Sequence, residues 1–307
     1  MKNNQLMIYG AYGYAGELMV REAVAQGLRP IIAGRDDEKL KPIATELSLE
    51  CRAFGVRNTG SNLQDISVLL NCAGPFSATA EPLARACLAQ QIHYLDITGE
   101  IDIFRKCHAL DEEARQQNVL ILPGAGTDIV PTDCLAAMLK EKLPVATRID
   151  LALSFGTNPS IGTVNTMIES FGKGGLIREG GMLKVVSNAF QMRKIPFQNK
   201  PQWAMTIPWG DVFTSGISTG VPDGAVYMAM PRMSIYMIRL TNPVKGILNT
   251  QFGQKITKRL AGWLMKKGPD AKALEAGRGQ FWGEAEAPDG EKLEMTMSTP
   301  NVYAPTP

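Results

Sequence analysis

The chain has 307 residues, of which 20% are charged and 45% hydrophobic, and its net charge is +2. This balance gives no electrostatic basis for binding nucleic acid or an anionic membrane, and no apolar run is long enough to span a bilayer. Two histidines and five scattered cysteines suggest no metal site, and unpaired cysteines suit a reduced, cytoplasmic environment. The composition is typical of a soluble globular protein with room for two domains.

A glycine turn follows the first apolar run. Residues 5–17 read QLMIYGAYGYAGE, in which a short strand pattern passes into a helical pattern. In a dinucleotide-binding turn, glycines permit a tight bend, let the backbone approach the pyrophosphate and let the helix pack on the strand. The helix N-terminus then meets the negative charge. The cofactor-binding residues predicted here are Gly10, Tyr12, Gly13, Tyr14, Ala15 and Gly16.

The second predicted strand, residues 29–33, ends in Gly34-Arg35-Asp36. An acid at such a position binds the ribose 2′-hydroxyl of NAD, whereas an arginine accommodates the 2′-phosphate of NADP. Arg35 can hold a phosphate with paired hydrogen bonds, so the sequence favours NADP. Asp36 is the competing residue for NAD, but it precedes a helical pattern and is expected to cap the second helix.

Short apolar runs alternate with amphipathic helices over the first 122 residues, which predicts a parallel sheet covered on both faces. We expect a Rossmann-type doubly wound α/β domain over residues 1–130. Its strands are predicted near 5–9, 29–33, 50–54, 67–72, 92–97 and 119–122, and its helices near 15–26, 37–48, 77–90 and 101–117. Ligands bind at the carboxyl ends of the strands in such sheets.

The fourth strand opens into an uncharged loop, residues 71–76, NCAGPF. Its backbone can lie close to the cofactor, and the alternative is a plain Gly-Pro turn before the next helix. Cys72 is expected to be a buried small side chain rather than a reactive thiol. The cofactor-binding candidates in this loop are Cys72, Ala73, Gly74, Pro75 and Phe76.

The fifth and sixth strands are followed by candidates for catalysis. The segment YLDITGE, residues 94–100, places Asp96, Thr98 and Glu100 at the rim expected to face the nicotinamide. The alternative is that Thr98 caps the next helix and Glu100 lies in its first turn. The turn PGAGTDIVPTD, residues 123–133, adds Asp128, which can orient a substrate or hold the cofactor amide.

The composition changes from residue 146, where RIDLALSF alternates apolar and polar residues. This alternation predicts an antiparallel sheet with one solvent-exposed face. We expect a second, α+β domain over 131–307, built on a mostly antiparallel sheet, with a helix over 162–171. An amphipathic helical region is predicted over 243–267, and such a face most commonly packs on its own domain.

Several segments, in this order, resemble the saccharopine dehydrogenase-like reductases, including the trans-acting enoyl reductase branch. They are GAYGYAG, AGR, NCAGPF, YLDITGE, PGAGTDIVPTD, SFGT followed by a Gly-rich link and IREGG, and WGDVFTSGISTGVPDGAVYMAMP, and together they span most of the chain. The resemblance implies a nicotinamide-binding Rossmann domain, a second domain whose sheet can form a homodimer, and hydride transfer on a C=N or C=C bond of a small molecule. It implies cofactor contacts for Gly10, Gly13, Gly16 and Arg35, and it settles no catalytic residue.

Two main functions remain open from the sequence, beside a third, a membrane-associated partner of a larger lipid-synthesis enzyme, which the Met-rich stretch 226–238 and the amphipathic region after it suggest. The leading one is an NADP-dependent oxidoreductase, in which the cofactor supplies the hydride and the protein supplies position and charge. The other is a catalytically silent NADP(H)-binding sensor or scaffold, which the scarcity of histidine and the lack of a clear acid suggest. Membrane association is not expected.

Overall fold

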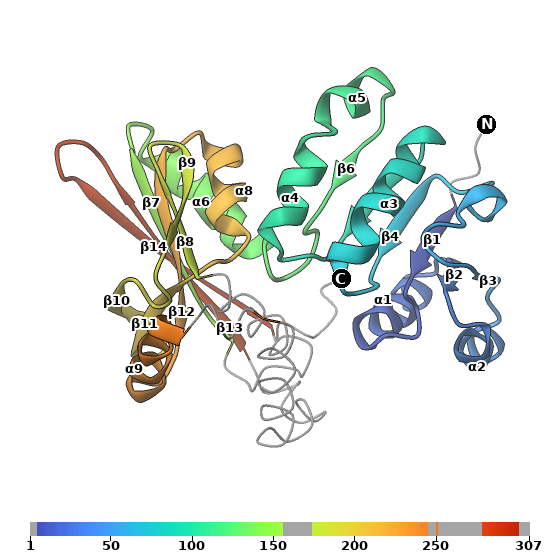
Figure 1. The fold of residues 1–307 in the computed structure, drawn as a ribbon, viewed down its shortest axis with the longest axis horizontal. Coiled ribbons are helices and arrows are strands. Elements are labelled where there is room, and N and C mark those ends of the chain that lie inside the picture. Colours follow the sequence, from blue (N-terminus) through green and yellow to red (C-terminus); the bar gives the residue numbers. More distant parts are fainter. Residues whose placement is uncertain (1–4, 156–173, 245–249, 251–277, 301–307) are drawn as a thin grey trace. The chain divides into compact units, whose positions relative to one another are not determined.

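The computed structural model describes residues 5–155, 174–244, 250 and 278–300 (Figure 1). The chain forms two compact units that divide between Asp128 and Ile129. The helix expected over 162–171 lies outside the described residues, as does most of the amphipathic region expected over 243–267.

The first unit contains a six-stranded parallel sheet in the order β3-β2-β1-β4-β5-β6. The chain starts in the middle, builds outward to β3, and then crosses back to build from β4 to β6. This reversal beside β1 confirms the predicted doubly wound Rossmann architecture. The strands are β1 (Leu6–Tyr9), β2 (Ile31–Gly34), β3 (Cys51–Ala53), β4 (Val68–Asn71), β5 (His93–Asp96) and β6 (Ile121–Leu122).

Helices cover both faces of this sheet. Met7 and Tyr9 lie in a core cluster with Leu83 of α3, whereas Ile8 lies in another cluster with Val20 of α1. Successive residues of β1 thus bury on opposite faces, which explains why this strand is apolar without alternation. The helices are α1 (Tyr14–Ala25), α2 (Asp37–Leu47), the 3₁₀ helix η1 (Gly60–Leu63), α3 (Phe76–Ala89), α4 (Ile101–His108) and α5 (Asp111–Gln116).

The helix predicted over 101–117 is two helices. The chain leaves the helical path at Ala109 and Leu110, and α5 restarts at Asp111. Leu110 is buried in the same core cluster as Ile103 of α4 and Ala114 of α5. The break between the two short helices therefore coincides with the burial of Leu110.

The second unit is built on an eight-stranded, mostly antiparallel sheet. Its main path is β10-β11-β12-β7-β13-β14, and the pairing of β12 with β7 is parallel; β8 pairs with β12 and β9. The strands are β7 (Arg148–Ser154), β8 (Gly175–Glu179), β9 (Met182–Val186), β10 (Met192–Pro196), β11 (Pro201–Ile207), β12 (Asp223–Ala229), β13 (Arg278–Glu286) and β14 (Lys292–Pro300). This confirms the predicted α+β class.

Helices of the second unit are α6 (Val130–Lys142), α8 (Asp211–Thr219), α9 (Arg232–Leu240) and the 3₁₀ helix η2 (Asn242–Val244). Helix α6 packs closely on one face of the sheet: a methyl group added at Gly283 of β13 would lie 2.6 Å from a side-chain carbon of Leu139. Glycine at this position therefore allows the helix to approach the strand.

The prediction that one face of residues 148–155 is exposed to solvent was wrong. Six of the seven residues of β7 are buried, and among them Asp150 is only 4% exposed. The polar side of this strand is covered by charged side chains from β10 and β13. Alternation of polar and apolar residues gave the correct strand, but it did not distinguish solvent from a layer of ion pairs.

Candidate functional site

The glycine turn of the first unit is closed to side chains. Gly10 has a φ of +86°, and its amide donates to the carbonyl oxygen of Ala33 at 2.7 Å. A methyl group added at Gly10 would lie 2.7 Å from the backbone nitrogen of Ala73. One added at Gly16 would lie 2.2 Å from the carbonyl oxygen of Gly10. Both positions therefore require glycine, as the sequence predicted for a backbone-lined turn.

The N-terminus of α1 begins directly after this turn. Gly13 occupies the N-cap position and has no side chain to bond the first amides of the helix. Tyr14 is 54% exposed, Ala15 is half-buried and Gly16 is buried. This end of the helix carries a partial positive charge, and its location at the carboxyl end of β1 suits a diphosphate.

The loop after β4 lies beside the glycine turn. Ala73 contacts Gly10 through its backbone, whereas Gly74 and Pro75 are exposed and Phe76 begins α3. Cys72 is buried in the core cluster of Ile8, and this burial, with a smaller effect of Asp96, raises the pKa of its thiol to about 12. The structure thus brings this loop to the predicted cofactor residues, and Cys72 is an unreactive core residue there.

Arg35 follows the last residue of β2 and its side chain is exposed. Within the described part of the chain it makes no hydrogen bond or ion pair. Asp36 occupies the N-cap position of α2, but it forms no side-chain capping bond. Its carboxylate instead lies 3.3 Å from Nζ of Lys39, so the expected capping interaction is replaced by an ion pair.

A chain of hydrogen bonds connects the loops after β4, β5 and β6. The Tyr94 hydroxyl donates to Oδ2 of Asp96 at 2.8 Å and accepts from Nδ2 of Asn71 at 3.1 Å. Oδ1 of Asn71 accepts from the amide of Ala73 at 3.0 Å. Oδ1 of Asp96 accepts from the amides of Thr98 at 3.0 Å and Gly124 at 2.9 Å. The buried carboxylate therefore holds three loops at the carboxyl edge of the sheet.

Asp96 and Thr98 are fully buried. Burial raises the pKa of Asp96, against the opposing effect of the hydrogen bonds that it accepts. Thr98 Oγ1 accepts from the amide of Glu100 at 3.1 Å, one residue before α4 begins. These contacts favour a positioning role for both residues; catalysis by Asp96, Thr98 or Glu100 stays a prediction. The role of Asn71 in this hydrogen-bond chain was not predicted, because nothing in the sequence indicates that it contacts Tyr94.

Asp128 ends the first unit and is half-buried. Burial raises the pKa of its carboxyl group to about 6. A group with such a pKa is mostly ionised at neutral pH yet can still exchange a proton, which suits general acid–base chemistry.

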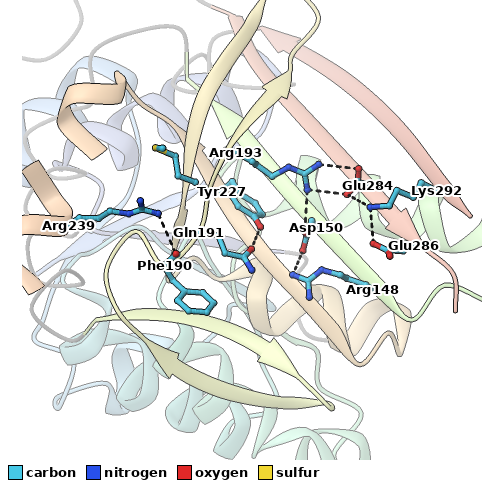
Figure 2. Close-up of a pocket in the computed structure, with 11 residues that line it drawn as sticks. Arg148, Asp150, Phe190, Gln191, Arg193, Tyr227, Arg239, Glu284, Glu286 and Lys292 are labelled. Atoms are coloured by element: carbon cyan, nitrogen blue, oxygen red, sulfur yellow. Dashed lines mark hydrogen bonds and ion pairs between the residues drawn. The ribbon is translucent and has the colours of Figure 1, made fainter. Parts of the chain in front are cut away.

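A cavity of about 460 Å³ opens on the sheet of the second unit (Figure 2). Arg193 binds both carboxylate oxygens of Glu284 at 3.1 Å and lies 3.5 Å from Asp150. Asp150 also pairs with Arg148 at 2.9 Å, and the guanidinium of Arg193 lies 4.7 Å from the centre of a Trp282 ring. These charges satisfy one another, so we interpret the cluster as a structural network. The sequence did not predict it, because Arg193 and Glu284 are 91 residues apart.

Within the described ranges, no helix has the length and apolar character needed to cross a membrane. The same residues include no group of three or more histidine, cysteine, aspartate or glutamate side chains placed to hold a metal ion.

Strand order, the glycine turn and the free helix N-terminus define the first unit as a dinucleotide-binding domain. Residues 6–122 match the family model of the saccharopine dehydrogenase NADP binding domain. The N-terminal unit is therefore similar to that domain family, and this match confirms both the predicted resemblance and the predicted cofactor, NADP.

Full-length relatives agree with this assignment. The chain is 25% identical over 233 residues to the human protein named saccharopine dehydrogenase-like oxidoreductase, covering 66% of this chain and 53% of that one. It is 28% identical over 205 residues to a candidate trans-acting enoyl reductase of Mycobacterium tuberculosis, covering 60% and 44%. The chain thus spans about half the length of the curated relatives it matches.

The fold is also that of a solved saccharopine dehydrogenase. The enzyme of Saccharomyces cerevisiae described as L-Glu forming aligns with a TM-score of 0.62, covering 97% of this chain and 85% of the yeast chain. Sequence identity is 9%, so this likeness concerns the fold alone.

Proposed function

We propose that this protein is an NADP-dependent oxidoreductase that transfers a hydride to or from a C=N or C=C bond of a small molecule. The observation that carries the proposal is the glycine turn, in which side chains at Gly10 and Gly16 are excluded by backbone atoms. Such a turn leaves only backbone beside the N-terminus of α1, where a diphosphate binds. Arg35 supports the choice of NADP, because its exposed guanidinium has no competing partner among the described residues.

The bond type is supported by the relatives. An enoyl reductase acts on a C=C bond, and the family resemblance implies C=N chemistry for saccharopine dehydrogenase-like proteins. When bound, the nicotinamide cofactor supplies the hydride. Asp128 is the side chain that we assign to proton exchange, because its pKa of about 6 permits it near neutral pH.

A direct test uses NADPH labelled with deuterium at C4, prepared separately for each face of the ring. The purified protein is incubated with pools of imines and conjugated enones, and the products are examined by mass spectrometry. Transfer of one deuterium from one of the two labelled cofactors supports the proposal, and an Asp128→Asn variant should slow this transfer while still binding NADPH.

Tight NADPH binding without transfer to any member of either pool would contradict the oxidoreductase assignment. It would favour the alternative function, a sensor or scaffold that binds NADP(H) and has no turnover. Failure to bind NADPH at all would contradict both.

A further inference from the structure

A compact group of side chains lies at the carboxyl end of β2, outside the glycine turn itself. It consists of Tyr12 from the turn, whose ring lies beside Gly34, Arg35, which follows Gly34 in the chain, and Lys39 from the first turn of α2, which lies over the Tyr12 ring. The sequence predicts that Arg35 binds the cofactor phosphate, and it predicts no role for Lys39. The arrangement of the three side chains gives Lys39 one.

The Tyr12 ring lies beside Gly34. A methyl group added at Gly34 would be 2.6 Å from Cε1 of Tyr12 and 3.3 Å from Cδ1. Gly34 is therefore needed to seat the ring, although its φ is not in the left-handed region. The ring fills the space beside the last residue of β2, where the adenosine end of a dinucleotide lies in this fold.

Lys39 is held near this ring by two weak contacts. Its Nζ lies 5.6 Å from the centre of the Tyr12 ring, within the range of a cation–π interaction. Nζ also lies 3.3 Å from Oδ2 of Asp36, and the two side chains are 63% and 37% exposed. An exposed ion pair of this kind contributes little to stability, so the ammonium group can turn toward a stronger anion at small cost.

Arg35 lies at the same edge of the sheet. Burial raises the pKa of Tyr9, the nearby Tyr12 adds to this effect, and the charge of Arg35 opposes it. The Tyr9 hydroxyl is held at the carboxyl end of β1, because it donates to the carbonyl oxygen of Phe54 at 3.0 Å. Arg35 and Tyr12 both lie near enough to this hydroxyl to change its pKa.

The carboxylates around α2 would repel a phosphate unless they are compensated. Asp37 and Glu38 each lie 2.8 Å from Nζ of Lys41, which pairs with both. Asp36, the nearest in sequence to Arg35, pairs with Lys39. Removal of Lys39 would therefore subtract a cation and leave the Asp36 carboxylate uncompensated, which disfavours a 2′-phosphate and suits a ribose hydroxyl.

We infer that Lys39, seated over the Tyr12 ring, is the second cation of the adenosine 2′-phosphate site and helps Arg35 to select NADP over NAD. This inference rests on the proposed NADP function. It assigns a specificity role to a lysine that is four residues away from the arginine and lies in the first turn of α2.

The test measures binding of 2′,5′-ADP and 5′-AMP by calorimetry, because these two ligands differ only in the 2′-phosphate. We expect Lys39→Gln to weaken 2′,5′-ADP binding by about five- to tenfold, on the scale of one exposed charge contact, and to leave 5′-AMP unchanged. Lys41→Gln is the matched control, since Lys41 is on the same helix with similar exposure, 56%, and pairs with other carboxylates. It should weaken 2′,5′-ADP binding less than Lys39→Gln does, because it uncovers two carboxylates but removes no cation from the Tyr12 ring.

A second pair of variants tests the contact between Lys39 and the Tyr12 ring. Tyr12→Phe keeps the ring and should keep the preference for 2′,5′-ADP, whereas Tyr12→Leu removes the ring face and should reduce it by about the same factor as Lys39→Gln. Equal effects of Lys39→Gln and Lys41→Gln would overturn the inference, and so would a loss of 5′-AMP binding equal to the loss of 2′,5′-ADP binding.

The proposed function can fail separately. If the wild-type protein binds neither ligand, the nucleotide site itself is refuted. If Arg35→Gln abolishes the preference for 2′,5′-ADP and Lys39→Gln leaves it intact, only the role of Lys39 is refuted.

Discussion

Replacing Tyr94 by phenylalanine removes one hydroxyl from the hydrogen-bond chain that joins the loops at the carboxyl edge of the first sheet. The ring of Tyr94 is fully buried, and phenylalanine retains its shape, so packing is preserved. Oδ2 of Asp96 loses its 2.8 Å bond, and Nδ2 of Asn71 loses its 3.1 Å partner while keeping Thr79 at 3.2 Å.

We expect this change to cost about 2 kcal/mol, because a buried hydrogen bond to a carboxylate is lost and an acceptor is left unsatisfied. The cost should also depend on pH. Burial already raises the pKa of Asp96, and the Tyr94 bond opposes that rise. Without this bond the native state holds the Asp96 proton to higher pH, so the destabilisation should be larger near pH 8 than near pH 5.

Amide hydrogen exchange reports this effect locally. A loss of about 2 kcal/mol should speed exchange at the amides of Thr98 and Gly124 roughly 30-fold, since both donate to Asp96. The four tryptophans lie between residues 203 and 282, so tryptophan fluorescence monitors the second unit and should be unchanged. Tyr12→Phe is the control for loss of a hydroxyl in the same unit. Unchanged exchange at both amides in Tyr94→Phe would refute the proposed role of the network.

Two further predictions concern the glycine turn and Asp128. Gly10→Ala should abolish NADPH binding and lower the free energy of unfolding by several kcal/mol. The control is Gly27→Ala, because Gly27 has a similar φ of +82° but open space around it; this variant should lose only about 1 kcal/mol and bind NADPH normally. Equal effects of the two substitutions would contradict the close approach of Gly10 to Ala73. In carbon-13 titrations of aspartate-labelled protein, Asp128→Asn should remove a carboxyl signal that titrates near pH 6. Between its ordinary pKa and 6 the native wild type binds more protons than the unfolded chain, so its stability should fall as pH rises, and the variant should lose that dependence.

The architecture of the first unit was predictable because it depends on patterns among residues close together in the sequence. The strands β1 and β2 are short apolar runs, and β1 at Leu6–Tyr9 lies within one residue of its predicted bounds. Gly10 and Gly16 have roles that depend on spacing between neighbours in the chain, and the structure shows the close contacts that the spacing implied. The break at Ala109 and Leu110 was missed, since a buried leucine fits a continuous helix equally well.

The hydrogen-bonded and charged networks were not predictable in the same way. Asn71 contacts Tyr94 across 23 positions, and Arg193 contacts Glu284 across 91, so no periodicity relates the partners. Asp96 was expected to be catalytic because of its location at a strand end. The location of Asp96 at the end of β5 was correctly inferred. The burial of its carboxylate and the hydrogen bonds that this group accepts depend on the loops that fold over it. Lys39 lacked a role because its proximity to Tyr12 depends on the path of α2.

We propose that the first unit binds NADP through its glycine turn and Arg35. The most direct measurement is calorimetric titration of the purified protein with NADPH and with NADH, in parallel on the wild type and on Arg35→Gln. We predict tighter binding of NADPH by the wild type and a loss of this preference in the variant, with NADH binding retained. Equal affinity of the wild type for both cofactors, or a preference for NADPH that survives in Arg35→Gln, would contradict the assignment.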